Sequence, residues 1–191
     1  MSEKSLWQRL WSPSKSKWLL GIPIGAFLAV MVGVFGVLGV NGAFYLSNQN
    51  DVCYGCHIGM DTIVEEYEQS VHFKNRKGIQ ADCADCHVPT DFIPKLKTKI
   101  IALGDVYHMA VGTYNMENFE QHRNELAQSA YEKLKAVDSQ MCKTCHEPSQ
   151  WDTSLQPKRV VLNHNPELWK EKDKTCVDCH QGVAHQRPVI K

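Results

Sequence analysis

Cys53-Tyr54-Gly55-Cys56-His57 and Cys83-Ala84-Asp85-Cys86-His87 bound the stretch that decides the fold of this chain. The same C-x-x-C-H spacing returns at Cys142-Lys143-Thr144-Cys145-His146 and at Cys176-Val177-Asp178-Cys179-His180, so the four motifs use all eight cysteines. C-x-x-C-H is the pattern of covalent c-type haem attachment, in which two thiols bond the haem and the adjacent His reaches the iron. Zinc sites or redox dithiols would explain the cysteine pairs but not the four histidines that follow them. The sequence therefore predicts four covalently bound haems c.

These motifs supply two sets of candidate site residues. The covalent haem bonds are expected at Cys53, Cys56, Cys83, Cys86, Cys142, Cys145, Cys176 and Cys179. The first iron ligands are expected at His57, His87, His146 and His180.

An uncharged stretch lies upstream of the first motif. Residues 18–50 contain no charged side chain, and residues 18–40 are a continuous apolar run. As a helix this run would span about 35 Å, enough for the hydrocarbon core of a bilayer. A cleaved secretory signal is the alternative, but its apolar region is usually shorter and is followed by a small-residue cleavage site. We expect a retained transmembrane anchor.

The flanking charges predict the orientation of the anchor. Four basic residues and one acidic residue precede it, and the first basic residue after it is Lys74. By the positive-inside rule, residues 1–17 form a cytoplasmic basic tail, residues 18–40 cross the inner (cytoplasmic) membrane once, and residues 41–191 are periplasmic. The exported part is slightly acidic, so it has no basic surface typical of nucleic-acid binding. The glycine-containing anchor leaves a homodimer possible.

The periplasmic part is expected to be all-α. Helices are predicted over residues 60–72, 94–111 and 115–137 from apolar residues at helical spacing, and no stretch alternates as a strand would. With fewer than 40 residues per haem, residues 41–191 cannot bury four macrocycles inside a separate core. The paired spacing of the motifs indicates two dihaem units joined by a helical spacer.

Second axial ligands must come from outside the motifs, because low-spin haems in electron carriers usually have two protein ligands. Five histidines remain, and we expect ligands first among His72, His164 and His185, which lie near motifs; His108 and His122 are weaker candidates. Met60, three residues after His57, could bind the first iron through its thioether or simply fill a gap in packing.

With these motifs, the sequence resembles the NapC/NirT family of membrane-anchored tetrahaem quinol dehydrogenases. Within that family it is most similar to the short NapC type. Besides the motifs, the resemblance rests on Glu66-Tyr67-x-x-Ser70-Val71-His72, Lys99-Ile100-x-x-x-x-Asp105-Val106-Tyr107, Gln121-His122-Arg123 and the run from Cys176 to His185. Two departures concern the first two motifs. Relatives usually have the Met two residues after the motif His, and many have His where this chain has Thr90.

The resemblance implies both ligands and a substrate site. It implies that His185 completes the haem of His87, His72 that of His146, and His164 that of His180. It also implies a quinol site with Lys99 and Asp105 near the first haem, where the haem domain meets the membrane. The alternative for Lys99 and Asp105 is that they belong to an ordinary solvated helix face.

The expected function is therefore electron transfer with quinol dehydrogenase activity. Quinol from the membrane pool would be oxidised, and the electrons would pass to a periplasmic terminal reductase, first of all nitrate reductase. Donation to a nitrite or TMAO reductase, or a quinol-independent soluble multihaem shuttle, is the alternative. A substrate-reducing multihaem enzyme would need an open iron position, which the supply of spare histidines disfavours.

Overall fold

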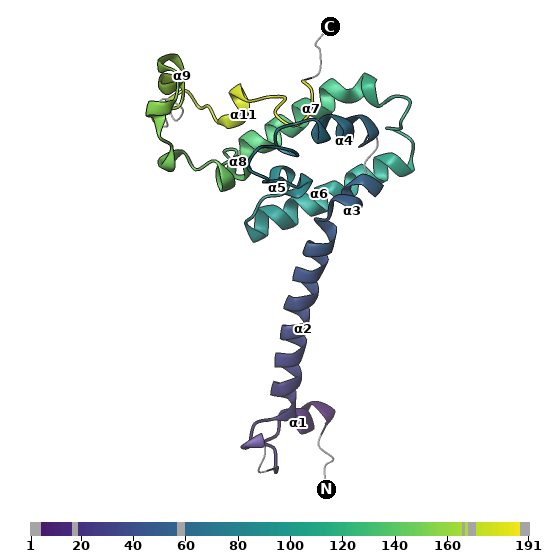
Figure 1. Cartoon of the computed structure of the whole chain (residues 1–191). Helices are drawn as coiled ribbons and strands as arrows, with labels where there is room; N and C mark the ends of the chain where they lie inside the picture. Colours follow the sequence, from purple (N-terminus) through teal and green to yellow (C-terminus); the bar gives the residue numbers. More distant parts are fainter. Residues whose placement is uncertain (1–4, 17–18, 57–59, 166, 168–170, 188–191) are drawn as a thin grey trace. The chain divides into compact units, whose positions relative to one another are not determined.

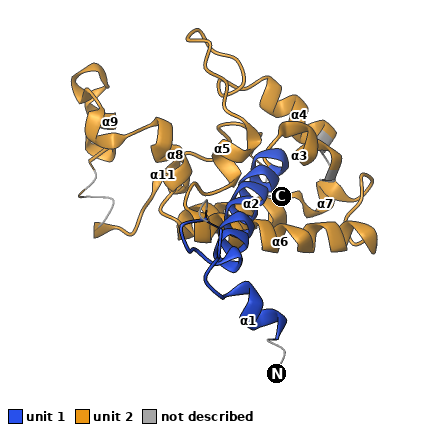
Figure 2. Cartoon of the chain, turned by 90° about the horizontal axis from the view of Figure 1, so that it is seen from below, with its two compact units in different colours: residues 1–47 blue, residues 48–191 orange. Residues whose placement is uncertain are grey.

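The computed structural model describes residues 5–16, 19–56, 60–165, 167 and 171–187, and it forms two compact units, residues 1–47 and 48–191 (Figure 2). Every regular element in the described part is helical, and none of those residues is in a strand (Figure 1). The all-α prediction is confirmed.

In the described part of the first unit, a short helix precedes a long one. Helix α1 (Leu6–Leu10) is capped by Ser5, whose Oγ accepts a hydrogen bond from the backbone N–H of Gln8. Helix α2 covers Ile24–Ser47, about 36 Å at 1.5 Å per residue, and is long and apolar enough to cross a membrane. The predicted boundaries at residues 17/18 and 40/41 stay a prediction.

Helix α2 is shifted toward the C-terminus relative to the apolar run, and local chemistry explains why. Leu20 and Gly21 have positive φ angles, which interrupt a right-handed helix, and α2 begins directly after Pro23. Past the run, Asn41 donates from its side chain to the carbonyl of Val37 at 2.8 Å, so this polar residue is satisfied within the helix.

The second unit contains two long helices. Helix α6 covers Phe92–Ala110 and α7 covers Phe119–Ala136, close to the predicted ranges. Helix α7 starts later than predicted because the side chain of Asn115 accepts hydrogen bonds from the N–H groups of Glu117 and Asn118, which favours a turn.

Shorter helices carry the motifs and their surroundings. Helix α4 (Met60–Glu68) ends earlier than predicted, because Ser70 Oγ accepts from the N–H groups of His72 and Phe73 and stabilises a turn there. Further helices in the described part of the chain are α3 (Asn50–Cys56), α5 (Cys83–His87), α8 (Gln140–Cys145), η2 (Pro148–Gln150), η3 (Thr153–Leu155), α9 (Lys158–Asn163) and α11 (Cys176–Cys179). Helix α3 packs against α5, α5 against α8, and α11 against α7.

Protein atoms alone form a very small core in the described part of the chain. The buried apolar residues there are Tyr67, Ala84, Phe119, Met141 and Val177. Helix α6 has no buried residue at all, although it is rich in large apolar side chains. A folded unit of this size normally buries well over half of the surface that its unfolded chain exposes. Contacts between protein atoms alone therefore stabilise this fold only weakly.

Candidate haem ligands and quinol site

Three pairs of histidine rings face one another, and each pair joins one motif His to one spare His. The ring centroids are 6.2 Å apart for His72 and His146, and 6.2 Å apart for His87 and His185. The centroids of His164 and His180 are 5.9 Å apart. The first two pairs join residues that lie far apart in the sequence, whereas His164 and His180 lie close together in it. All three coincide with the pairings implied by the resemblance.

This separation fits a metal ion held between two imidazoles. With metal–nitrogen bonds of roughly 2 Å and a nitrogen about 1.1 Å from each ring centre, two imidazoles on opposite sides of one ion have centroids about 6 Å apart. The residues present therefore fit an iron with two histidine ligands at three places.

The spare histidine in each pair is also oriented by a hydrogen bond at Nδ1. His72 Nδ1 lies 3.2 Å from the carbonyl oxygen of Val183, and His185 Nδ1 lies 3.2 Å from that of Ile63. His164 Nδ1 lies 2.8 Å from Gln156 Oε1. Because each partner oxygen only accepts, Nδ1 carries the proton and Nε2 is left with a lone pair for a metal.

Burial acts in the same direction at one of these histidines. It lowers the pKa of the His185 imidazole, with the hydrogen bond to the Ile63 carbonyl opposing it. A neutral ring is the form that ligates a metal.

The two other spare histidines lack this arrangement. His108 Nδ1 is buried without a hydrogen-bond partner, and its ring contacts Tyr107 and Tyr114. His122 contacts Tyr114, and its Nδ1 lies 3.7 Å from Glu125, beyond normal hydrogen-bond distance. Among the described residues neither ring is paired with a motif histidine, and whether either ring binds an iron stays a prediction.

The ligands of the first haem remain a prediction. His57 lies outside the described residues, and so do the side chains of Cys56 and Met60.

Contacts between cysteines show that motifs that follow one another in the sequence are also neighbours in space. The thiol of Cys53 is hydrogen-bonded to that of Cys83, which in the unattached chain lowers the pKa of Cys53 to about 6 and raises that of Cys83. Cys142 and Cys176 make the same contact. Between these pairs, Cys86 interacts electrostatically with Cys145 where α5 packs on α8. First and second, second and third, and third and fourth motifs are thus neighbours.

The two predicted quinol residues both lie on α6. Burial lowers the pKa of Lys99, and the thiol of Cys53 opposes this shift, so Lys99 is close enough to the first motif to act on it. Asp105 is exposed, six residues further along the helix. Six residues correspond to about 600° of rotation, so the two side chains do not share one stripe. Lys99 thus lies near the first motif, while the role of both residues stays a prediction.

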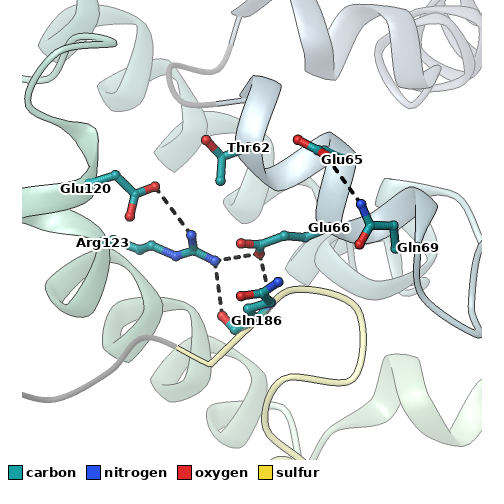
Figure 3. Close-up of a pocket in the computed structure, with 7 residues that line it drawn as sticks. All are labelled: Thr62, Glu65, Glu66, Gln69, Glu120, Arg123 and Gln186. Atoms are coloured by element: carbon teal, nitrogen blue, oxygen red, sulfur yellow. Dashed lines mark hydrogen bonds and ion pairs between the residues drawn. The ribbon is translucent and has the colours of Figure 1, made fainter.

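A polar pocket lies elsewhere in the second unit and does not include the predicted quinol residues. It has a volume of about 410 Å³ and is lined by Thr62, Glu65, Glu66, Gln69, Glu120, Arg123 and Gln186 (Figure 3). Its lining is polar, whereas a quinol needs an apolar surface with a few polar groups. It is therefore not a quinol pocket of the ordinary kind.

The NapC/NirT cytochrome c family model, N-terminal region, matches residues 15–190. The chain belongs to this family. A "putative tetraheme cytochrome-c type" protein of Allochromatium vinosum is 42% identical over 158 residues, covering 82% of this chain and 84% of that protein. The cytochrome c-type protein NapC of Haemophilus influenzae is 37% identical, covering 97% of this chain and 89% of NapC. The cytochrome c-type protein TorY of Escherichia coli O157:H7 is 39% identical, but this chain spans only 44% of its length.

Membership of the NapC/NirT family confirms the resemblance and the expectation of covalently bound haem c. Several residues that contact the candidate haem ligands or their neighbours were nevertheless not predicted from the sequence. Gln156 had no motif to mark it, and backbone acceptors such as the carbonyl of Ile63 leave no trace in a sequence. Glu66 and Arg123 belong to the segments that carry the resemblance, but only the structure shows that they bond each other.

Proposed function

We propose that this protein is a membrane-anchored tetrahaem cytochrome that oxidises quinol and passes the electrons to a periplasmic reductase, with nitrate reductase as the first candidate. The observation that carries the proposal is the set of three histidine pairs with centroids 5.9 to 6.2 Å apart. Irons with two protein ligands suit electron transfer, because no position is left for a substrate.

Three haems would each be held by one motif His and one spare His. The proposed ligand pairs are His87 with His185, His146 with His72, and His180 with His164. The haems supply one-electron redox chemistry, while the protein sets their spacing, ligands and surroundings. The chain-order contacts between motifs support a path from the first motif to the fourth.

The first haem would be the entry point, because Lys99 lies near its Cys53. Oxidation of a quinol breaks two O–H bonds and releases two protons and two electrons. We propose that Lys99 donates a hydrogen bond to one quinol oxygen and that the Asp105 carboxylate accepts the proton of the other oxygen in the first one-electron step. The second electron would follow by the same route, with the remaining proton released to water. The apolar side chains of α6, which are exposed on the protein, offer a surface suited to the quinol ring and tail.

The expected membrane anchor supports a role in quinol oxidation, because quinol is dissolved in the membrane. Helix α2 is long and apolar enough to cross a membrane, and the basic residues before it favour a cytoplasmic N-terminus. The haem motifs would then lie in the periplasm, where haem attachment and the reductase are expected.

Substitutions on α6 test the quinol site. We expect Asp105→Asn and Lys99→Gln to lower the rate of haem reduction by a quinol analogue by a factor on the order of 10², the size of general acid–base effects. The measurement is stopped-flow absorbance of the full-length protein in lipid nanodiscs. Lys97→Gln is the matched control, because it removes the same charge from an exposed position on the same helix.

Reduction by dithionite should be unchanged in all three variants, since it bypasses the quinol site. Wild-type quinol rates in both Asp105→Asn and Lys99→Gln would show that the site lies elsewhere. The acceptor is tested separately, by mixing the reduced protein with periplasmic nitrate, nitrite and TMAO reductases. Fastest reoxidation by nitrate reductase is the expected result.

A further inference from the structure

The backbone of Gln186, the residue that follows His185, is held on both sides by one ion pair. Its N–H donates to Glu66 Oε2 at 2.8 Å, and its carbonyl accepts from Arg123 Nη2 at 3.1 Å. The same two atoms, Glu66 Oε2 and Arg123 Nη2, lie 2.5 Å apart. Figure 3 shows Arg123 between Glu120 and Glu66, with Gln186 beneath the pair.

The Glu66–Arg123 pair is largely shielded from water. The exposed fractions of the two side chains are 8% and 12%. Arg123 Nη1 also lies 3.3 Å from Glu120, so the guanidinium bonds two carboxylates and a carbonyl. Charge-assisted hydrogen bonds of this kind are short, strong and directional, and removing one partner leaves the other as a buried, uncompensated charge.

Helix α4 holds His185 as well as Gln186. The carbonyl of Ile63 accepts from His185 Nδ1, and Glu66 lies three residues later on the same helix. One turn of α4 therefore fixes the ring of His185 and the backbone of the next residue. The centroid of that ring lies 6.2 Å from the centroid of the His87 ring, and the two ring planes are inclined by 29°.

We propose that Glu66 and Arg123 are positioning residues for His185: their ion pair holds the segment after the fourth motif so that the imidazole faces His87. The inference rests on the proposed ligation of the second haem by His87 and His185. Without the pair, Gln186 would lose both of these backbone hydrogen bonds. The segment would keep the uncharged hydrogen bonds between His185 and Ile63 and between His72 and Val183, and His185 would leave the iron for part of the time.

Electron paramagnetic resonance of the oxidised, fully haem-loaded protein tests this role. Glu66→Ala is expected to add a high-spin ferric signal worth up to one haem per chain, relative to wild type. Glu65→Ala is the matched control: Glu65 lines the same pocket on the same helix, and among the described residues its side chain bonds Gln69 and not Gln186 (Figure 3). The spectrum of Glu65→Ala should be that of wild type. Added imidazole should remove the extra signal of Glu66→Ala, because a free ligand can replace a displaced one.

A milder and a stronger variant make the test decisive. Glu66→Asp keeps the charge but shortens the side chain, so it should give a smaller high-spin fraction than Glu66→Ala. If Glu66→Ala does not accumulate with haem, the spectrum of Glu66→Asp tests the positioning role instead. His185→Ala should give the full signal of one haem. If His185→Ala gives that signal while the Glu66 variants keep the wild-type spectrum, the positioning role is wrong and the ligation stands. An unchanged spectrum for His185→Ala would instead overturn the ligand pair.

Discussion

At the scale of single residues, the three spare histidines that pair with motif histidines differ in the group that accepts their Nδ1 proton. His72 and His185 donate to main-chain carbonyls, which no substitution removes directly. His164 donates to the side chain of Gln156, and its ring also contacts Trp151 at a centroid distance of 5.2 Å. The basicity of a metal-bound imidazole depends on this second hydrogen bond, so Gln156 is a residue through which one haem can be tuned selectively.

We predict that Gln156→Leu raises the reduction potential of the haem proposed to lie between His164 and His180. Loss of the acceptor makes the imidazole a weaker donor, which favours the ferrous state. Gln156→Glu should shift the same potential downward, because a carboxylate accepts the proton more strongly. Spectroelectrochemical titration of the haem-loaded protein measures both shifts.

Gln128→Leu is the control for this titration, since Gln128 is an exposed residue on α7 whose amide bonds Glu132. Potentials that do not differ between the Gln156 variants and this control would contradict the assignment of His164 as a ligand with a tuned Nδ1–H.

At the scale of helices, the two halves of the haem domain share the same hydrogen bond between neighbouring motifs. Asn50 and Ser139 each lie three residues before the first cysteine of a motif pair. Asn50 Oδ1 accepts from the N–H of Cys83 at 3.1 Å, and Ser139 Oγ accepts from the N–H of Val177 at 3.3 Å. In each half, a polar side chain before one motif thus bonds the start of the helix that carries the next.

A second feature of those helices is repeated too. The N–H of Asp82 donates to Asp85 Oδ2, and the N–H of Thr175 donates to Asp178 Oδ2, both at 2.8 Å. Carboxylates in the first turn are favourable to a helix because they satisfy free N–H groups and oppose the helix dipole. The shared hydrogen bonds, together with the matching cysteine contacts, support the two dihaem units expected from motif spacing.

We predict that Ser139→Ala destabilises the haem-loaded protein by about 1–3 kcal/mol, because the buried N–H of Val177 loses its acceptor. Ser139 is fully buried, whereas Asn50 is only half-buried, so Asn50→Ala should cost less. Chemical denaturation followed by circular dichroism measures the loss.

Ser154→Ala serves as the reference substitution, since Ser154 is exposed and its hydroxyl donates to the side chain of nearby Asp152, which is also exposed. Equal stability of Ser139→Ala and Ser154→Ala would show that the buried hydrogen bond contributes nothing measurable.

The sequence predicted the elements better than it predicted their ends. The long helices α6 and α7 were predicted from apolar residues at helical spacing, which place these residues on one face of a helix even where, as on α6, that face is exposed. The ends of α4 and α7 differed because Ser70 and Asn115 accept local backbone hydrogen bonds, an alternative to the helix that periodicity does not register.

At the scale of the whole molecule, contacts across the two halves carry most of the information that sequence alone could not supply. The pairing of His72 with His146 joins a histidine between the first two motifs to the third motif. Spacing alone left the partners of the spare histidines open, and the pairings came only from resemblance to the family. The Glu66–Arg123 pair has the same character, because 57 residues separate its members.

The small protein core leads to the last prediction, which concerns the chain without haem. The described residues bury five apolar side chains, far fewer than a stable domain of this length needs, so the haems must supply most of the apolar contact. We expect the chain produced without haem attachment, or with all eight motif cysteines replaced by alanine, to lack a cooperative thermal transition by circular dichroism. It should also be cut rapidly by protease at concentrations that leave the haem-loaded protein intact. The haem-loaded protein in the same detergent is the control, because α2 is expected to stay helical in either form. A sharp transition of the haem-free chain would show that contacts within the polypeptide are enough to stabilise the fold and that the haems are not needed for folding.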